Sequence, residues 1–267
     1  MSVAIGVPTP RAVALTNAAT ITWRNLMGFV RVPQSIFFAS LQPTMFVLIF
    51  NYVFGGAISR SLPPGVGYLD YLMPGVFVMT LAFGTILTAI GLAEDLNTGI
   101  IERFRTLPMA RSAVLSGRTG ADLCRSLYVL GWLTALGYAL GFRVHQGLLG
   151  FLAATLLTLT FTFALSWVLC LVGLLAPSGE SANLMSFPIL FPLAFVSSGL
   201  LPISTMPGWL QVFAAHQPVT YTVNAVRALI LGGPAATAVI GSLAWSAGIL
   251  VVFAPLAIWR YRRAAFG

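Results

Sequence analysis

Residues 148–176 read LLGFLAATLLTLTFTFALSWVLCLVGLLA, a run of 29 residues without a charged side chain. In hydrocarbon the backbone must satisfy its own hydrogen bonds, so a long apolar run forms a helix, and roughly 20 residues cross about 30 Å. A strand of a membrane barrel would alternate apolar and polar residues, and this run does not. The stretch therefore predicts a membrane-spanning helix over about 148–176.

The remainder of the chain has the same apolar character. Of 267 residues, 58% are hydrophobic and 7% are charged, whereas soluble domains carry roughly 25% charged residues. Further apolar runs predict spans at about 34–55, 71–93, 121–141, 183–201 and 235–259. We expect one all-α membrane domain over residues 1–267 with six transmembrane helices.

A mildly amphipathic segment at about 12–32 precedes the first span. Leu15, Trp23 and Leu26 share one helical face, and Asn17 and Arg24 share the other. We expect an interfacial helix that lies along the membrane surface. Because the segment lacks the apolar core and cleavage site of a signal peptide, we also expect a retained, cytoplasmic N-terminus.

All 14 basic residues are arginine, and the sequence contains no lysine. Without a Walker A lysine the chain is not expected to hydrolyse ATP. With both termini in the cytoplasm, eleven arginines lie inside and three outside, in agreement with the positive-inside rule. Cys124 and Cys170 fall in or beside apolar runs, and His145 and His216 have no acidic pair at zinc-ligand spacing, so neither a disulfide framework nor a metal site is predicted. No Gly-x-Ser-x-Gly elbow and no acid pair at a helix centre occur in the sequence, so no catalytic site is predicted.

The segment 94–117 is the most polar internal loop. A helix starting at Thr98 would carry apolar residues at helical spacing beside two charged ones; these are Ile101, Phe104, Leu107, Glu102 and Arg105. Such a helix could dock into a groove of a partner protein. The alternative is a solvated loop whose arginines only anchor the chain.

Asp122 and Arg125 lie three residues apart at the start of the third predicted span. Either charge alone in lipid would cost at least ~2.5 kcal/mol, and residues three apart on a helix are neighbours. We expect a structural ion pair near the membrane interface, and a proton relay is the alternative.

Proline and glycine interrupt the chain after the fifth predicted span. Pro202 and Pro207 follow that span, and the apolar piece 219–231 is too short to cross a bilayer. The pattern predicts an outward-facing, broken or re-entrant helix pair over about 202–232.

Two stretches resemble the signature regions of the type-2 ABC transporter permeases, especially the daunorubicin-resistance branch, and the resemblance covers nearly the whole chain. The first is the internal loop, with Glu94, Gly99, Glu102, Leu107 and Pro108 followed by Gly117 and Arg118. By resemblance it implies a coupling helix, including Ile101, Phe104 and Arg105, that contacts an ATPase.

The second stretch reads SGLLPISTMPGWL (198–210) and HQPVTYTVNAVRALILG (216–232). It is similar to the family's outward segment at Gly199, Pro202, Pro207, Trp209, Pro218, Tyr221, Arg227 and Gly232. The resemblance implies two re-entrant half-helices that form an outer gate. Many relatives have an acidic residue near the arginine position where this chain has Asn224, so the resemblance does not carry over a charge pair with Arg227, although Asn can still bond to Arg.

The resemblance implies the permease subunit of an ATP-driven exporter of amphipathic drugs, lipids or glycolipids in a bacterial plasma membrane. It implies as partners two copies of a cytoplasmic ABC ATPase, which use ATP and Mg²⁺, and a second permease, identical or a sister chain. No enzyme activity, cofactor or nucleic acid is expected for this chain, and the first, second and fifth spans are expected to line the path. The alternative, a proton-coupled secondary multidrug transporter, would need buried titratable groups and usually an inverted repeat, and the sequence displays neither.

Overall fold

The computed structural model describes residues 27, 31, 33–62, 66–98 and 111–264. Within these ranges the regular structure is entirely helical, which confirms the all-α prediction. Of the expected interfacial helix at about 12–32, only Met27 and Arg31 belong to the described part of the chain.

Two rods of consecutive helical pieces begin the fold. The first consists of α2 (Pro33–Ile49), a π-helical turn (Phe50–Phe54), α3 (Gly55–Ile58) and a 3₁₀ turn (Ser59–Ser61). The second consists of α4 (Tyr68–Gly84) and α5 (Ile86–Asn97), with Thr85 between them. The first rod extends six residues beyond the expected end at Gly55, because α3 and the 3₁₀ turn continue it past the apolar run.

Single helices make up the rest of the bundle. They are α7 (Arg111–Leu140), α8 (Gly147–Leu175), α9 (Gly179–Phe195), the short helices α10 (Gly208–His216) and α11 (Pro218–Leu231), and α12 (Ala236–Ala264). A 3₁₀ turn (Ile203–Thr205) precedes α10. The two short helices occupy the segment for which a broken helix pair was predicted.

Five helical stretches are long and apolar enough to cross a membrane. They are Ile36–Ser61, Tyr68–Asn97, Gly120–Leu140, Gly147–Leu175 and Ala236–Tyr261. The protein is therefore a multi-pass membrane protein. The sixth predicted span, 183–201, corresponds to α9, which begins earlier and ends at Phe195 after 17 residues. It is not among the five, because 17 residues rise only about 25 Å.

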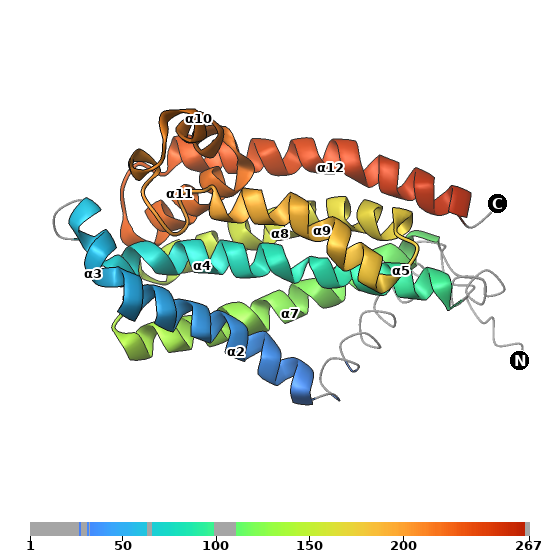
Figure 1. Cartoon of the computed structure of the whole chain (residues 1–267), viewed down its shortest axis with the longest axis horizontal. Helices are drawn as coiled ribbons and strands as arrows, with labels where there is room; N and C mark the ends of the chain where they lie inside the picture. The colour runs from blue at the N-terminus through green and yellow to red at the C-terminus, as the bar shows by residue number, and fades with distance from the viewer. Residues whose placement is uncertain (1–26, 28–30, 32, 63–65, 99–110, 265–267) are drawn as a thin grey trace, which may run out of the picture.

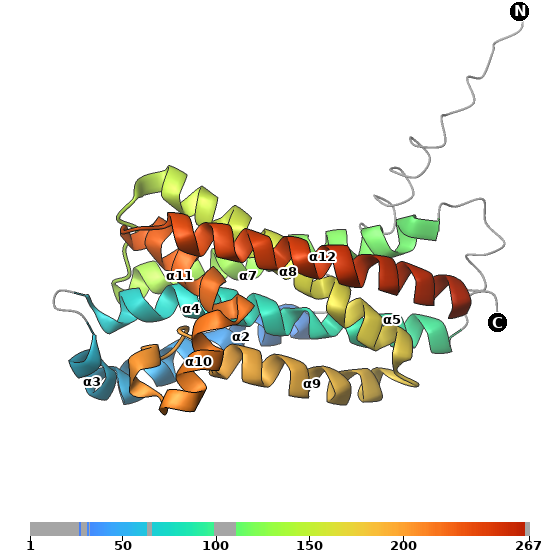
Figure 2. The same cartoon turned by 90° about the horizontal axis from the view of Figure 1, so that it is seen from above.

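The long helices lie side by side and run back and forth along the long axis of the molecule (Figure 1). One end, here called the α5 end, carries the last turn of α5, the first turn of α7, the turn 176–178 and the last turn of α12. The opposite end, the α10 end, carries α3, α10 and the first turns of α8 and α12 (Figure 2). Since α8 ends at the α5 end and α12 starts at the α10 end, the chain returns between them through α9.

The helix boundaries at the α5 end differ from the expected loop 94–117. Helix α5 continues to Asn97 and α7 begins at Arg111, so both flanks of that loop are helical. Thr98, expected to start a helix, ends α5, and its backbone N–H and its hydroxyl both donate to the Glu94 carbonyl oxygen at 2.9 Å. Hydropathy marks where a helix enters lipid, whereas these helices continue into polar sequence.

The second rod is the centre of the bundle. Residues 71–79 of α4 are all buried, and α4 contacts α7, α8, α9 and α11. Its closest neighbour is the chain segment after α9, because a Cβ placed on Gly75 would lie 2.0 Å from the carbonyl oxygen of Gly199. A side chain at Gly75 is therefore excluded by backbone contact, and α4 lies directly against the segment 196–200.

Candidate functional site

Arg227 on α11 is the centre of a polar network near the α10 end. Its guanidinium donates to the backbone carbonyl oxygen of Tyr71 at 3.1 and 3.3 Å and to that of Ser198 at 2.8 Å. It also donates to Asn224 Oδ1 at 3.0 Å and stacks over the Tyr71 ring at 3.7 Å from its centroid. All of these partners are neutral, so the charge is stabilised by carbonyl dipoles and an aromatic face.

Asn224 and Ser198 close the network around Arg227. Ser198 Oγ donates to Asn224 Oδ1 at 2.8 Å, so this oxygen accepts from two side chains. Tyr71 Oη donates to the Ser198 carbonyl oxygen at 3.1 Å. Asn224 thus accepts a hydrogen bond from Arg227 where an acidic residue would form a charge pair. Through its bonds Arg227 joins α4, the segment 196–200 and α11.

Gln217 fixes the start of α11 and the end of α9. Its side-chain oxygen accepts from the Val219 N–H at 3.0 Å and caps α11, whose first residue is Pro218. Its amide donates to the carbonyl oxygens of Leu193 and Val196 at 2.9 and 3.0 Å. These bonds compensate for the backbone groups left free where α9 ends.

The other residues of the predicted outer segment lie around this network. Pro207 precedes α10, Trp209 on that helix is 77% exposed, and the Tyr221 ring covers Gly241 of α12. Gly232 ends α11 with φ +100°, a conformation that favours glycine. Gly199 and Pro202 lie in the turn between α9 and α10.

Phenylalanine rings form a continuous ladder between the first rod, α4 and α9. Ring centroids 4.4–6.4 Å apart join seven residues, in contact order Phe54, Phe50, Phe46, Phe195, Phe191 and Phe187, with Phe83 touching both Phe187 and Phe195. Spacings of four place these rings on one face of each helix. Phe54, Phe187 and Phe191 are exposed, so one side of the ladder is open.

The predicted ATPase-coupling residues lie mostly outside the described part of the chain. Gly99, Ile101, Glu102, Phe104, Arg105, Leu107 and Pro108 all fall in the range 99–110. Glu94 is exposed on α5 and lies so near Gly179 that a Cβ there would be 2.8 Å from Glu94 Oε1. Asn97 donates to the Pro177 carbonyl oxygen at 2.7 Å, so the end of α5 is tied to the turn before α9.

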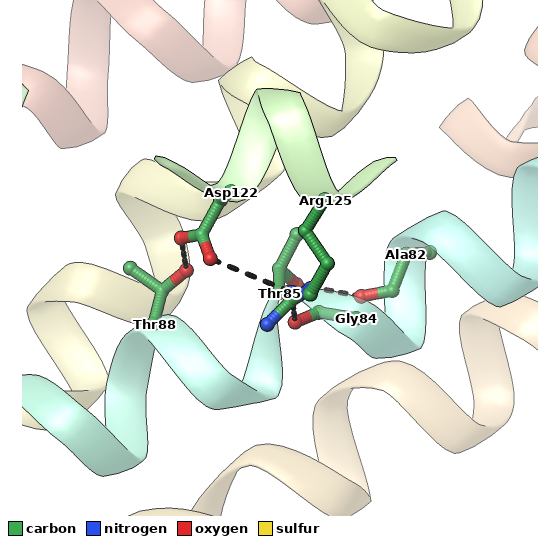
Figure 3. Close-up of polar contacts among 6 residues, drawn as sticks. All are labelled: Ala82, Gly84, Thr85, Thr88, Asp122 and Arg125. Atoms are coloured by element: carbon green, nitrogen blue, oxygen red, sulfur yellow. Dashed lines mark hydrogen bonds and ion pairs between the residues drawn. The ribbon is translucent and has the colours of Figure 1, made fainter. Parts of the chain in front are cut away.

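Asp122 and Arg125 form an ion pair, with a nitrogen–oxygen distance of 3.4 Å and side chains only 15% and 13% exposed. Figure 3 shows that both reach the junction of α4 and α5, where Arg125 donates to the Gly84 carbonyl oxygen and Asp122 accepts from the Thr88 hydroxyl. Because α7 begins at Arg111, the pair lies about 17 Å along the helix. The stretch of α7 that is long and apolar enough to cross a membrane begins at Gly120, two residues before Asp122.

Sequence reasoning did not find several residues of these networks. Tyr71 and Ser198 contribute backbone carbonyls, which have no side-chain signature, and Gly84 does the same for Arg125. Gln217 has a recognisable signal, because it directly precedes a proline that starts a short helix.

Taken together, the described helices define a multi-pass membrane protein with partly buried arginines at two interruptions of its helices. Over residues 16–231 the chain matches the ABC-2 type transporters, and it belongs to that family. It is 36% identical over 252 residues to the daunorubicin resistance ABC transporter permease protein DrrB1 of Streptomyces coeruleorubidus, covering 94% of this chain and 88% of that protein.

Two further relatives extend the comparison. The probable doxorubicin resistance ABC transporter permease protein DrrC of Mycobacterium tuberculosis is 32% identical over 246 residues, 91% of this chain and 87% of that one. The putative transport permease ycf38 of Cyanophora paradoxa is 26% identical over 211 residues, 77% and 71% of the two chains. The recognition of a type-2 ABC permease from the sequence is confirmed.

Proposed function

We propose that this chain is the permease subunit of an ATP-driven exporter that moves amphipathic drugs or lipids out of a bacterial cell. Two copies of a separate cytoplasmic ABC ATPase would use ATP and Mg²⁺, and a second permease, identical or a sister chain, would complete the path. The observation that carries the proposal is the arrangement of the bundle. Helix α5 ends and α7 begins at the α5 end, on either side of the predicted coupling residues, and the Arg227 network lies near the opposite end.

The orientation follows from charge. Arg260, Arg262 and Arg263 lie in the last turns of α12, at the α5 end, and arginine is enriched on the cytoplasmic side of membrane proteins. We infer that the α5 end is cytoplasmic, with both chain termini inside. This requires α9 as a sixth crossing, and its short length is compatible with local thinning of the bilayer.

The substrate path is inferred to follow the phenylalanine ladder. The ladder joins the first rod, α4 and α9, the elements at the expected first, second and fifth spans. Exposed aromatic faces bind apolar and planar groups of an amphipathic molecule by stacking. The names of the relatives point to drugs of the daunorubicin and doxorubicin type as the first compounds to test.

Co-purification with an ABC ATPase tests the proposal. The chain is expressed together with a cytoplasmic ABC ATPase, and Leu107→Ala is compared with Leu149→Ala, an exposed leucine at the α10 end. We expect Leu107→Ala to reduce ATPase retention and to raise daunorubicin accumulation in cells, and Leu149→Ala to leave both unchanged. Equal retention and equal accumulation in the two variants would contradict the coupling role of 98–110.

Membership in the ABC-2 family does not favour the proton-coupled alternative. The two mechanisms differ in energy source. Efflux that persists after ATP depletion but stops when the proton gradient is collapsed would replace the exporter proposal by the alternative.

A further inference from the structure

The second rod is interrupted at Thr85. In a continuous α-helix the Thr88 N–H would donate to the Gly84 carbonyl, but here it donates to the Thr85 carbonyl at 3.0 Å. The Thr85 N–H and hydroxyl both turn back to the Ala82 carbonyl, at 3.1 and 2.6 Å. The Gly84 carbonyl is therefore left without its helical donor.

Arg125 of α7 supplies the missing donor. Its guanidinium bonds to the Gly84 carbonyl oxygen, and Asp122 holds the same guanidinium while accepting the Thr88 hydroxyl (Figure 3). Interrupted helices are tolerated in lipid only where side chains satisfy the freed backbone groups. The four residues Gly84, Thr88, Asp122 and Arg125, here called the clamp, thus bridge both sides of the interruption from one neighbouring helix.

The clamp lies between the rest of the bundle and the ends of α5 and α7, the two helices that flank the segment 98–110 in the sequence. Thr85 lies 12 residues before the end of α5, and Asp122 lies 11 residues after the start of α7. At 1.5 Å per residue both are roughly 17 Å from the helix ends that flank this segment. A force applied at these two helix ends reaches Thr88 along α5 and reaches Asp122 and Arg125 along α7.

Beyond the clamp, α4 carries groups of both other sites. Phe83, two residues before Thr85, contacts Phe187 and Phe195 of the ladder. Tyr71, near the other end of α4, accepts from Arg227. A change in the angle between α4 and α5 at Thr85 would therefore move the exposed side of the ladder and strain the hydrogen bonds of the Arg227 network.

We propose that Asp122 and Arg125 are positioning residues that hold the α4–α5 interruption in one of two bend angles and so transmit motion of the adjoining ends of α5 and α7 to the ladder. The inference rests on the proposed function, because it needs the ATPase as the source of motion. Hinge bending at a few residues is a common form of such transitions. The ion pair suits this role because its hydrogen bonds can be exchanged without leaving a charge alone in lipid.

The bend is measured by spin-label distances in the complex with its ATPase, reconstituted in nanodiscs. Labels at Gly67→Cys and Thr98→Cys bracket the interruption, in a background where Cys124→Ser and Cys170→Ala remove the native thiols. ATP with vanadate is expected to shift the distance distribution of the unsubstituted clamp. The shifted fraction should fall about tenfold in Arg125→Gln, within the usual range of coupling between sites.

Matched variants separate positioning from general loss of structure. Arg125→Lys keeps a charged donor and should retain the shift. Arg143→Gln is the control, because it removes an exposed arginine that bonds only locally, to the Tyr138 and Phe142 carbonyls, with its side chain. It should leave the shift unchanged. Thr88→Val removes a single hydroxyl and keeps the test available if Arg125→Gln fails to assemble. The rate of ATP hydrolysis should stay within about twofold, since coupling and catalysis need not change together.

The two proposals fail in different ways. If the unsubstituted chain does not retain an ATPase, the proposed function is refuted and this inference with it. Two results obtained with the ATPase retained would overturn only the clamp inference. In the first, nucleotide shifts the spin-label distances in Arg125→Gln and Thr88→Val as much as in the unsubstituted clamp. In the second, nucleotide shifts the distances in none of the three proteins.

Discussion

Replacing Gly75 by alanine should separate α4 from the segment 196–200. The added Cβ would lie 2.0, 2.5 and 2.7 Å from the carbonyl oxygen, carbonyl carbon and Cα of Gly199. An ordinary contact needs about 3.4 Å, so one backbone must retreat by about 1.4 Å. The Tyr71 Oη bond to Ser198 is already 3.1 Å long and would be lost, and Arg227 could no longer reach both Tyr71 and Ser198.

The size of the effect follows from these losses. Overpacking costs about 1–3 kcal/mol, and each lost hydrogen bond costs about 1 kcal/mol. We expect Gly75→Ala to lower the stability of the folded chain by about 3 kcal/mol or more, which corresponds to a decrease of roughly 10 °C in the thermal midpoint.

Thermal unfolding in nanodiscs, followed by intrinsic fluorescence, measures this decrease. Gly248→Ala is the matched control, because a Cβ there meets nothing within 4 Å in the middle of α12. That substitution should be neutral or stabilising by about 0.5–1 kcal/mol, since glycine is unfavourable inside helices. Similar thermal midpoints for the two variants would refute the backbone contact between Gly75 and Gly199.

Two further substitutions test the network near the α10 end. Asn224→Asp keeps both accepted bonds and adds an opposite charge 3.0 Å from Arg227. Because charge-assisted hydrogen bonds are about twice as strong as neutral ones, the thermal midpoint should rise by a few degrees. A lowered midpoint would show that desolvation of the carboxylate prevails. Gln217→Leu removes the cap of α11 and two hydrogen bonds to the end of α9, a loss of about 2–3 kcal/mol in all. It should lower the thermal midpoint by several degrees, whereas the control Gln42→Leu, at an exposed site of α2, should not. Equal midpoints for the two variants would exclude the capping role.

The helices of the bundle could be predicted because lipid restricts the choices of the backbone. A run such as 148–176 has no polar partners other than its own peptide groups, and α8 is found at Gly147–Leu175. The breaks after α9 were also readable, since Pro202 and Pro207 lie close together beside Gly199 and Gly208, and proline is favoured at the first position of a helix, as at Pro218. Local composition thus determined where the chain is helical and where it is interrupted.

The contacts that close the sites could not be predicted in the same way. Arg227 reaches the Tyr71 carbonyl across 156 positions of sequence, and any peptide group could have accepted that bond. The bonds of the Asp122–Arg125 pair to the Thr88 hydroxyl and the Gly84 carbonyl could not be read from the sequence either, because they depend on how α7 packs against the second rod. Side-chain charges are visible in a sequence, but the free carbonyls that attract them arise only from the tertiary arrangement.

Both partly buried arginines contact backbone at an interruption of the bundle, but their partners differ in charge. Arg227 bonds only to neutral groups in the segment 196–200, α4 and α11, so any displacement leaves a guanidinium in an apolar environment without compensation. Arg125 has Asp122 on its own helix, three residues away, and keeps this counter-charge when the Gly84 bond opens. Because the cost of opening is lower at Arg125, movement of the second rod should occur at Thr85, with the Arg227 network as the fixed point against which α4 turns.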